Sequence, residues 1–354
     1  MPHEGDRHER LWMAWPTGGY TLGKTAADAE TARLTWAAVA NAAADFEPVS
    51  MVVHPRDERI APRYLSGSID LHVREIDDAW IRDSGPTFVV SDAHPGQVGA
   101  VTWTFNGWGR QEWASWEHDQ ALGPAVADWA GAVRIDSDLV NEGGGIHVDG
   151  LGTVLVTETV QRDPGRNPSL SRAEIEAELH RTLGTTRAVW LPRGLTRDSD
   201  RFGTRGHVDI VATIASPGRL LLHSQRDPSH PDFAVTAVLR ESLGQATDAG
   251  GTHFEILDLP APDVLRDGDG FVDYSYINHV LVNDGVIACS FGDPRDADAL
   301  AILRDAYPGR TVVAVDARPL FERGGGIHCI TQQQPAILRR TVTLSRVLRH
   351  PHPA

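Results

Sequence analysis

A glycine-rich phrase occurs twice in this sequence and constrains its fold more than any other feature. Residues 142–148 read Glu-Gly-Gly-Gly-Ile-His-Val, and residues 323–329 read Arg-Gly-Gly-Gly-Ile-His-Cys. Aligning the glycines places Glu142 opposite Arg323 and Val148 opposite Cys329. Glycine lacks a Cβ and adopts positive φ readily, so each copy can bring backbone close to a shared point. Two interpretations stay open: two turns of one β-rich domain, or two parts of one site carrying a carboxylate and a thiol.

Short apolar segments of strand type alternate with helical segments along the chain. Helices are expected to begin near Thr25, Ser115, Ser171, Asp232 and Asp296. Strands are expected from β-branched runs that end at Gly, Pro or Asp, namely 49–53, 87–90, 98–105, 153–156, 208–214, 219–223, 254–257 and 311–315, with a hairpin over 277–291. Repetition of strands plus one helix indicates a modular, radially arranged fold. We expect one domain over residues 10–348 and a disordered tail over 349–354.

Composition narrows the possible partners. The chain of 354 residues carries 48 acidic against 33 basic residues, a formal charge of −15. This charge argues against binding to nucleic acid or to an anionic membrane, and it is compatible with a small cationic substrate. No segment approaches the length of an apolar membrane span, and the charged N-terminus lacks the apolar core of a signal peptide. We therefore expect a cytoplasmic protein.

The two cysteines and the histidines indicate no framework of disulfides or metals. Two cysteines cannot build a disulfide scaffold, and Cys289 is expected to be an apolar filler on a buried strand. The 16 histidines form neither H-x-x-x-H nor H-E-x-x-H, and Asp267-Gly268-Asp269-Gly270 is too short for a calcium loop. We expect no metal site.

One nucleotide-binding pattern is present. Residues 18–25 fit G-x-x-x-x-G-K-T and precede a predicted helix. Such a loop cradles phosphates only when a buried strand feeds into it. The preceding residues 12–17 predict a poor central strand because Pro16 removes a hydrogen-bond donor. A P-loop protein remains an alternative, although a chance match is favoured.

Two further segments suggest acid–base chemistry on a cation. If residues 203–211 are extended, His207 and Asp209 share a face, and a histidine beside a carboxylate can move protons at neutral pH; a structural histidine is the alternative. Residues 77–87 place three acids around Trp80 before a strand. Carboxylates pair with a cation and an aromatic ring offers its face, whereas a solvated loop would not explain the tryptophan.

Four dispersed motifs now identify a family. They are Asp78-x-Trp80-x-Arg82-Asp83-x-Gly85-Pro86-Thr87, Asn141-Glu142-Gly143-Gly144, Gly206-His207-Val208-Asp209, and residues 324–333. With Trp12 to Pro16 before them, the chain resembles the agmatine deiminase family of guanidino-group-modifying enzymes over almost its whole length. The resemblance implies an α/β fold, a five-bladed pseudo-symmetric propeller built from ββαβ-type repeats.

The resemblance also implies roles in hydrolysing a small cationic guanidino compound to a ureido product and ammonia. Cys329 would attack the guanidinium carbon, and His207 would protonate the departing amine and then activate water. Asp83, Glu142 and Asp209 would hold the guanidinium, with Trp80 lining the pocket. The leading substrate is agmatine, which would give N-carbamoylputrescine and place the enzyme in putrescine biosynthesis. No cofactor is implied, and a homodimer is an expectation that no sequence feature specifies.

Arg205 departs from the family pattern, which usually has an acidic or small polar residue before Gly206-His207. If it faces the same way as His207 and Asp209, its charge would repel a second cation. The substrate would then be a guanidino compound with a neutral or carboxylate tail. The alternative is that Arg205 pairs with a structural carboxylate elsewhere.

Overall fold

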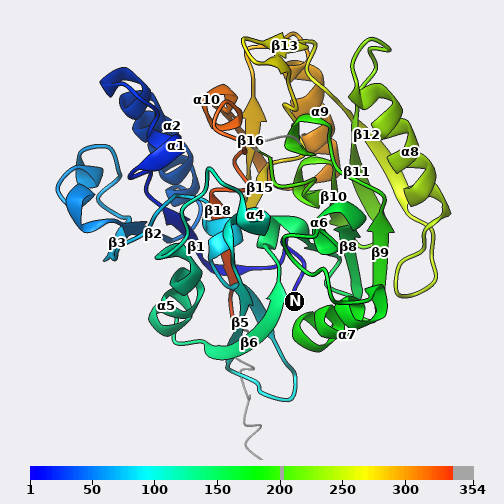
Figure 1. Ribbon diagram of the computed structural model, residues 1–354, viewed down its shortest axis with the longest axis horizontal. Coiled ribbons are helices and arrows are strands. Elements are labelled where there is room, and N and C mark those ends of the chain that lie inside the picture. The colour runs from blue at the N-terminus through cyan, green and yellow to red at the C-terminus, as the bar shows by residue number, and fades with distance from the viewer. Residues whose placement is uncertain (200–202, 338–354) are drawn as a thin grey trace, which may run out of the picture.

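The computed structural model describes residues 1–199 and 203–337. Within these residues five sheets repeat one topology (Figure 1). In each sheet a middle strand is bonded on both sides. It pairs antiparallel with one neighbour and in parallel with the other, which follows a long helix in the sequence. The five sets are β18 (Thr331–Pro335), β1 (His8–Ala14) and β2 (Val49–Val53); β4 (Thr87–Val90), β5 (Val98–Thr104) and β6 (Val133–Val140); β7 (His147–Val148), β8 (Thr153–Thr157) and β9 (Arg187–Leu191); β10 (Ala212–Ser216), β11 (Arg219–Ser224) and β12 (Glu255–Pro260); and β15 (Val280–Val282), β16 (Gly285–Ser290) and β17 (Thr311–Asp316).

One helix connects the parallel strands of each unit and lies toward the outside of the molecule (Figure 1). These helices are α2 (Ala26–Ala44), α5 (Leu122–Trp129), α7 (Arg172–Leu183), α8 (Asp232–Gln245) and α9 (Asp296–Ala306). Capping boxes start α2 and α7, where Thr25 pairs with Asp28 and Ser171 with Glu174. These reciprocal bonds satisfy backbone N–H groups that a helix start leaves free, so both starts follow from sequence.

The remaining elements are short. The sheet of the first unit gains a fourth strand, β3 (Asp70–Val73), and β13 (Arg266–Asp267) pairs with β14 (Gly270–Phe271). Short helices and 3₁₀ turns fill the connections: α1 (Gly19–Leu22), α3 (Ile81–Ser84), α4 (Gly107–Arg110), α6 (Glu158–Gln161), α10 (Arg318–Phe321), η1 (Pro55–Asp57), η2 (Ala61–Arg63), η3 (Asp119–Ala121), η4 (Gly143–Gly145), η5 (Arg197–Ser199) and η6 (Val208–Ile210). No helix of the described segments is long and apolar enough to cross a bilayer.

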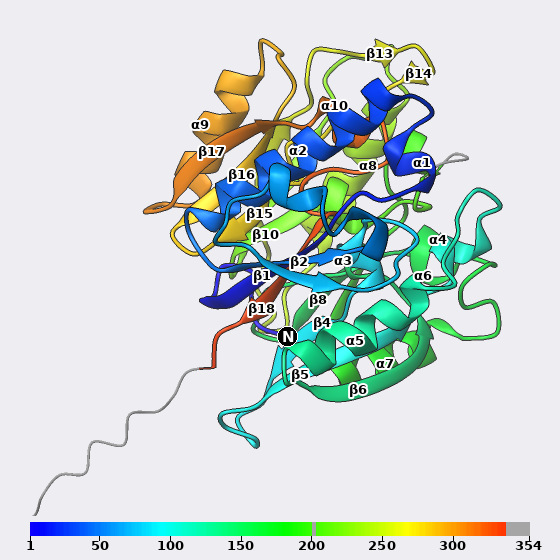
Figure 2. The same ribbon diagram turned by 90° about the vertical axis from the view of Figure 1, so that its left-hand side faces the viewer.

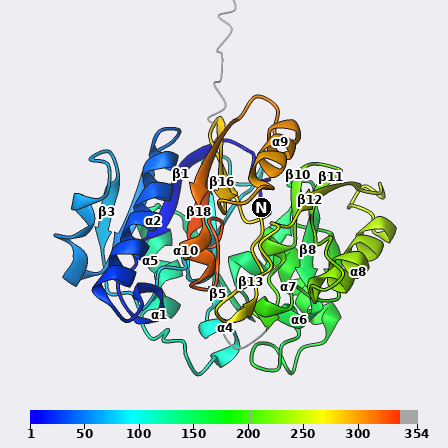
Figure 3. The same cartoon turned by 90° about the horizontal axis from the view of Figure 1, so that it is seen from above.

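The two ends of the described chain meet in one sheet. β18 pairs antiparallel with β1, so the last strand completes the first unit. Helix α2 packs against β16 and β17 of the last unit as well as against its own sheet (Figure 2). The first unit lies on the opposite side of the molecule from α7 and α8 (Figure 3). Buried apolar clusters continue from one unit to the next, so the core is shared between neighbours.

Many predicted elements are confirmed, and three are corrected. β1 is a central strand, bonded on both sides, because it ends at Ala14 and leaves Pro16 outside the ladder. The second long helix begins at Leu122 instead of near Ser115, since Asp119 is held in a 3₁₀ turn by accepting the N–H groups of residues 77 and 78. Residues 208–210 form a turn, and β10 begins only at Ala212. The predicted tail, 349–354, lies outside the described residues.

Candidate active site

The thiol of Cys329 lies in the loop that leads into β18. It is 5% exposed, and its Sγ accepts a hydrogen bond from Asn278 Nδ2 at 3.3 Å. The same amide group donates to the carbonyl of Asp209 at 3.1 Å, while Asn278 Oδ1 accepts from the backbone N–H of His328 at 2.9 Å. Asn278 therefore ties the cysteine loop to the turn that carries Asp209.

Glu142, directly before the first glycine triplet, is fully buried and doubly engaged. Arg166 Nε donates to both of its carboxylate oxygens at 2.9 and 3.0 Å. On the other side, Glu142 Oε2 lies 3.2 Å from Nε2 of His207. Burial by itself raises the pKa of Glu142, but the charges of Arg166 and His207 lower it below its ordinary value. Glu142 is therefore a carboxylate that orients the imidazole of His207.

His207 is 1% exposed and stands before the turn η6. Its backbone N–H donates to Asp198 Oδ2 at 2.9 Å, and its Nδ1 lies 3.8 Å from Asp83 Oδ1 without a hydrogen-bond partner. Burial lowers the pKa of His207, but the carboxylates of Asp83 and Glu142 outweigh it and raise the pKa to about 9. The ring is an imidazolium at neutral pH and can give up a proton.

Asp83, on helix α3, receives two hydrogen bonds from different segments. Trp108 Nε1 donates to Oδ2 at 2.8 Å, and the N–H of Gly144 donates to Oδ1 at 3.0 Å. Burial raises the pKa of Asp83 to about 6, with Asp209 and Glu142 adding to the effect and His207 opposing it. The other two acids of this segment serve the fold, since Asp77 bonds His118 and Asp78 bonds Thr21. Only one of the three acids predicted to bind a cation reaches the site.

Asp209 lies within the turn η6 and is 3% exposed. Its Oδ2 is 2.7 Å from Nδ1 of His328 and 3.6 Å from the Cys329 Sγ, whereas Oδ1 is buried without a hydrogen-bond partner. His207 and Asp209 do converge, but not through strand alternation as predicted. The turn η6 brings them together, and the two unpartnered atoms, His207 Nδ1 and Asp209 Oδ1, are the groups that a ligand can satisfy.

The two glycine phrases meet at this point because their backbones lack side chains. A Cβ on Gly144 would stand 2.5 Å from His207 Nδ1, 2.9 Å from Asp83 Oδ1 and 3.0 Å from Asp209 Oδ2. A Cβ on Gly325 would stand 2.6 Å from a ring atom of Trp80 and 3.2 Å from the Cys329 Sγ. No glycine of the first triplet has a positive φ, so close approach is the property used there, whereas Gly324 of the second triplet also has a φ of +99°.

The thiol rests in its protonated form. Burial raises the pKa of Cys329 well above its ordinary value, and the carboxylates of Asp209 and Asp83 raise it further. A thiolate is the nucleophilic form of cysteine. A cation bound among these carboxylates would lower the thiol pKa, so activation is coupled to the arrival of a positively charged ligand.

A cleft opens above these groups. Trp80 forms one wall at 5% exposure, and its ring meets Trp36 edge-on at 5.6 Å. Trp108 and Trp113 stack at 5.3 Å on the other side. The lining also includes Asp83, Gly203, Thr204, Arg323, Gly324 and Cys329. Gly203 and Gly324 also border a larger outer cavity, whose charged lining consists of Arg197, Asp198, Asp232, Asp269, Asp273 and Glu322.

Arg205 takes a different place from the one that strand alternation predicts. Both Arg205 and Gly206 have positive φ, at +77° and +107°, so the backbone turns between Arg205 and His207. Arg205 Nε lies 4.0 Å from Asp163 Oδ2, and its Nη1 donates to the Ser199 carbonyl. This geometry supports the structural alternative, and a role in substrate binding stays a prediction.

The glycine–lysine pattern at residues 18–25 does not form a phosphate cradle. The helix α1 interrupts the loop, and Asp28 accepts the N–H groups of Lys24 and Thr25 at 3.1 and 3.0 Å. A carboxylate of the chain thus occupies the place where a phosphate would bind. The pattern matches by chance.

Sequence reasoning missed several residues of the site. Arg166 and Asn278 orient Glu142 and Cys329, and Trp108 fixes Asp83. None belongs to the four motifs, and each contacts a partner far away in sequence. Among these three residues, only Trp108 lies in an unusual backbone conformation. Its φ is +55°, and the glycines on both sides of it also have positive φ.

The comparisons with known proteins agree with this geometry. The family described as Porphyromonas-type peptidyl-arginine deiminase matches residues 1–335. The "Putative agmatine deiminase" of Streptomyces coelicolor is 54% identical over 336 residues, 95% of this chain and 98% of that protein. The agmatine deiminase of Stutzerimonas stutzeri is 38% identical over 360 residues, 95% of each chain.

A solved structure described as the agmatine deiminase of Enterococcus faecalis catalyzing its reaction superimposes with a TM-score of 0.88. It is 30% identical, and the match covers 96% of each chain. The resemblance inferred from the four motifs is therefore confirmed along the length of the chain. The chain belongs to the Porphyromonas-type peptidyl-arginine deiminase family.

Proposed function

We propose that this protein hydrolyses the guanidinium group of agmatine to N-carbamoylputrescine and ammonia. The observation that carries the proposal is the convergence of the Cys329 thiol, the His207 imidazolium and three carboxylates beside one cleft. The relatives from Stutzerimonas stutzeri and Enterococcus faecalis are named agmatine deiminases, which supports the choice of substrate.

The carboxylates form the binding site for the guanidinium plane. Asp209 Oδ1 has no hydrogen-bond partner among the described residues, and its Oδ2 lies 3.6 Å from the Sγ of Cys329, which lines the cleft together with Asp83. A guanidinium presents paired N–H donors, so it can bond carboxylates in its plane while the Trp80 ring covers one face. This arrangement places the guanidinium carbon next to the Cys329 Sγ.

In the first step the substrate charge favours the thiolate, and Sγ forms a bond to the guanidinium carbon. The bond from that carbon to one terminal nitrogen breaks. His207 donates a proton through Nδ1, and the nitrogen leaves as ammonia. The thiol proton passes to solvent, so His207 is left neutral, and the product is a cationic amidino-thioether on Cys329.

In the second step water adds to the same carbon while neutral His207 accepts a proton from it. Collapse of the adduct breaks the C–S bond and releases the ureido product. The thiolate takes the hydroxyl proton of the adduct, and the sum of both steps is a guanidinium plus water giving the ureido product and ammonium. None of these steps calls for a metal or an organic cofactor.

The outer cavity suits the distal ammonium of agmatine. Five of the charged side chains that line it are carboxylates, against Arg197. A chain of four methylenes would pass from the guanidinium site toward this cavity beside Gly203 and Gly324, which border both spaces. The carboxylates of the cavity attract the second positive charge of the substrate.

The five ββαβ units are proposed to form one five-bladed propeller, with the site at the centre where the glycine phrases of two units meet. The shared apolar clusters and the β18–β1 pairing support a single domain. A homodimer, a cytoplasmic location and a role in putrescine biosynthesis stay predictions. Sedimentation of the purified protein would test whether it forms a homodimer.

The decisive experiment measures ammonia release from agmatine, 4-guanidinobutyrate and arginine with no amine acceptor present. We expect the highest kcat/KM for agmatine and formation of the ureido product. A preference for 4-guanidinobutyrate would replace agmatine by a carboxylate-tailed substrate, and a need for an acceptor would indicate amidino transfer. Lys24→Ala should leave turnover unchanged, because Lys24 is exposed and is not among the residues that line the cleft. Nucleotide binding that this variant abolishes would support the P-loop alternative.

Arg205→Ala tests the remaining question about the tail. If Arg205 only pairs with Asp163, the ratio of kcat/KM for agmatine to that for 4-guanidinobutyrate is unchanged. A ratio that rises in the variant would show that Arg205 faces the substrate tail.

A further inference from the structure

We propose that Glu4, on the N-terminal segment, acts through His328 to hold Asp209 ionised and turned toward the cleft. Glu4 and His328 are thus positioning residues for the nucleophile site. The kinetic part of this inference rests on the proposed deimination, whereas the charge state of His328 can be measured without any substrate.

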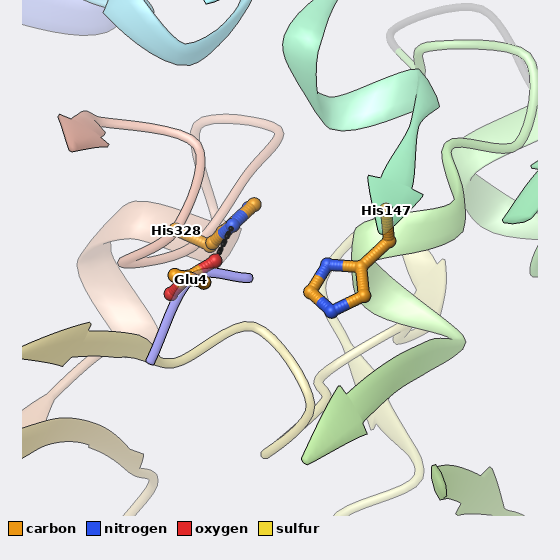
Figure 4. A group of neighbouring side chains, drawn as sticks. All are labelled: Glu4, His147 and His328. Atoms are coloured by element: carbon orange, nitrogen blue, oxygen red, sulfur yellow. Dashed lines mark hydrogen bonds and ion pairs between the residues drawn. The ribbon is translucent and has the colours of Figure 1, made fainter. Parts of the chain in front are cut away.

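The imidazole of His328 lies between two carboxylates. Its Nδ1 is 2.7 Å from Asp209 Oδ2. On its other side, Nε2 is 2.9 Å from Glu4 Oε2, a contact that Figure 4 shows as a dashed line. The three residues are buried, with 4%, 3% and 6% of His328, Asp209 and Glu4 exposed. An ionised carboxylate can only accept hydrogen bonds, so both ring nitrogens must carry hydrogen. The geometry therefore defines a carboxylate–imidazolium–carboxylate chain.

The N-terminal segment fixes Glu4 independently of His328. Glu4 Oε1 accepts the N–H of Leu281 on strand β15 at 2.9 Å. The backbone carbonyl of Glu4 also lies 2.7 Å from Nε2 of His8. Because both its carboxylate and its backbone are anchored, Glu4 presents Oε2 to His328 in a fixed direction.

The consequence reaches the site through Asp209. His328 binds Oδ2, which leaves Oδ1 as the buried oxygen without a partner. Burial raises the pKa of Asp209, but the hydrogen bond and charge of His328 lower it below its ordinary value. The imidazolium thus offsets the repulsion among the carboxylates near Cys329, so the aspartate stays ionised before the substrate arrives.

The groups that face His328 determine whether it stays charged. Burial and the Arg82 guanidinium, whose Nε donates to the His328 carbonyl at 3.2 Å, both lower its pKa. The carboxylates of Glu4 and Asp209 outweigh them and raise the pKa above its ordinary value. Glu4 is one of these two carboxylates, and it is not among the residues that line the cleft.

A metal ion is the alternative occupant of this place. Ligand atoms of Glu4, His147 and His328 lie within 4.8 Å of one another. However, His147 Nε2 is already 2.9 Å from the Thr213 hydroxyl, and His328 Nε2 bonds Glu4. A divalent cation would have to displace the proton of His328 beside the positive charge of Arg82. The hydrogen-bonded chain is therefore favoured.

Glu4→Gln is the test, because it keeps the shape of the side chain and removes its charge. One amide NH₂ must then face either the Leu281 N–H or His328 Nε2, so the imidazolium loses its second carboxylate. In protein with ¹⁵N-labelled histidine, we expect the wild-type His328 nitrogens to show an imidazolium at pH 7 and the variant to show a neutral ring. The His328→Asn spectrum assigns the signals.

We expect Glu4→Gln to lower kcat/KM about 10- to 100-fold, by analogy with the partners that orient metal ligands. Loss of the neighbouring positive charge should raise the pKa of Asp209 toward that of Asp83, and the acid limb of kcat/KM should move upward as both carboxylates are protonated. Glu4→Asp keeps the charge and should restore part of the activity.

Glu47→Gln is the matched control. Glu47 is also buried, with Oε1 3.1 Å from His8 Nδ1 and Oε2 accepting the Asn283 N–H at 2.6 Å. Since His8 in turn holds the Glu4 carbonyl, this variant reports what loosening the N-terminal segment alone does. We expect it to lower the melting temperature without moving the acid limb.

Three results would overturn the inference. They are a neutral His328 in the wild-type protein, an equal shift of the pH profile in both glutamine variants, and one bound metal ion per chain in the purified protein. If the protein releases no ammonia from any guanidino compound, the proposed function fails, while the spectrum of His328 still decides its charge.

Discussion

The two glycine phrases share one sequence pattern but place their histidines in opposite environments. His147 and His328 occupy aligned positions, both are buried, and their rings lie 6.4 Å apart. Burial lowers the pKa of His147 to about 3, and its Nε2 lies 2.9 Å from the hydroxyl of Thr213. His328 lies between two carboxylates, and its pKa is raised. Local sequence sets the position of each ring, but partners from other segments set its charge.

The residues flanking the triplets diverge in the same way. Glu142 reaches His207, whereas the aligned Arg323 donates to the carbonyls of Thr21, Pro319 and Asp28. At the other end, Val148 is an apolar residue of β7, whereas Cys329 carries the thiol. Each phrase thus contributes one reactive or binding group from a different end.

The largest effect is expected from the last position of the phrases. Cys329→Ala should lower kcat by about 10³-fold or more, because the nucleophile is lost, while agmatine still binds. Val148→Ala at the aligned position should reduce stability by about 1–3 kcal/mol through lost packing and leave kcat near wild type. Turnover and thermal unfolding of both variants measure this. Substantial activity in Cys329→Ala would contradict a covalent intermediate.

The second comparison concerns the triplets themselves. Gly144→Ala should reduce kcat/KM by about 100-fold, because its Cβ would stand 2.5 Å from His207 Nδ1 and shift the ring. Gly145→Ala is the control, since the nearest atom to a Cβ at this position would be a methyl group of Val160 at 3.2 Å. Steady-state kinetics of both variants would show whether close approach is specific to Gly144. Equal losses would mean that the whole turn is merely intolerant of side chains.

The aligned histidines should respond unequally. His328→Asn should lower kcat/KM about 10- to 100-fold, since Asp209 loses the cation that keeps it ionised. His147→Asn loses one hydrogen bond to Thr213, which costs about 1 kcal/mol of stability, and should keep its activity. Similar activity losses in the two variants would indicate that the pair serves packing alone.

The smallest effect is expected on the pH dependence of activity. Asp83, with a pKa of about 6, must be ionised to bind the guanidinium, and His207, with a pKa of about 9, must be protonated to release ammonia. Activity should therefore rise through pH 6 and fall through pH 9, changing about tenfold per unit outside these limits. Profiles of kcat/KM for wild type and His328→Asn should share the alkaline limb and differ in the acid limb. A shifted alkaline limb would mean that His328 also controls His207.

Much of the fold could be predicted from local patterns. Strand segments such as 49–53 and 87–90 and the capping boxes of α2 and α7 depend on neighbours in sequence, which sequence shows directly. The prediction that residues 12–17 form a poor central strand was wrong, because β1 ends at Ala14, before Pro16. The start of α5 was misplaced because Asp119 bonds a distant segment.

The candidate site divides along the same line. The residues that belong to motifs could be named from the sequence without any distance. They are Cys329, His207, Asp83, Glu142, Asp209 and Trp80. The partners that set the charge and orientation of these side chains belong to none of the motifs. They are Arg166, Asn278, Trp108 and Glu4. Arg205 shows the limit most clearly, since its direction depends on two consecutive positive φ angles.

The sequence by itself determined the family, the alternation of strands and helices, and the residue types of the chemistry. Each of these depends on composition and spacing along the chain. Only the tertiary structure decided which acids face a cation, which of two aligned histidines is charged, and why the glycines are needed. Electrostatics and steric contact depend on distances through space, and segments as far apart as Glu4 and His328 meet only when the chain is folded.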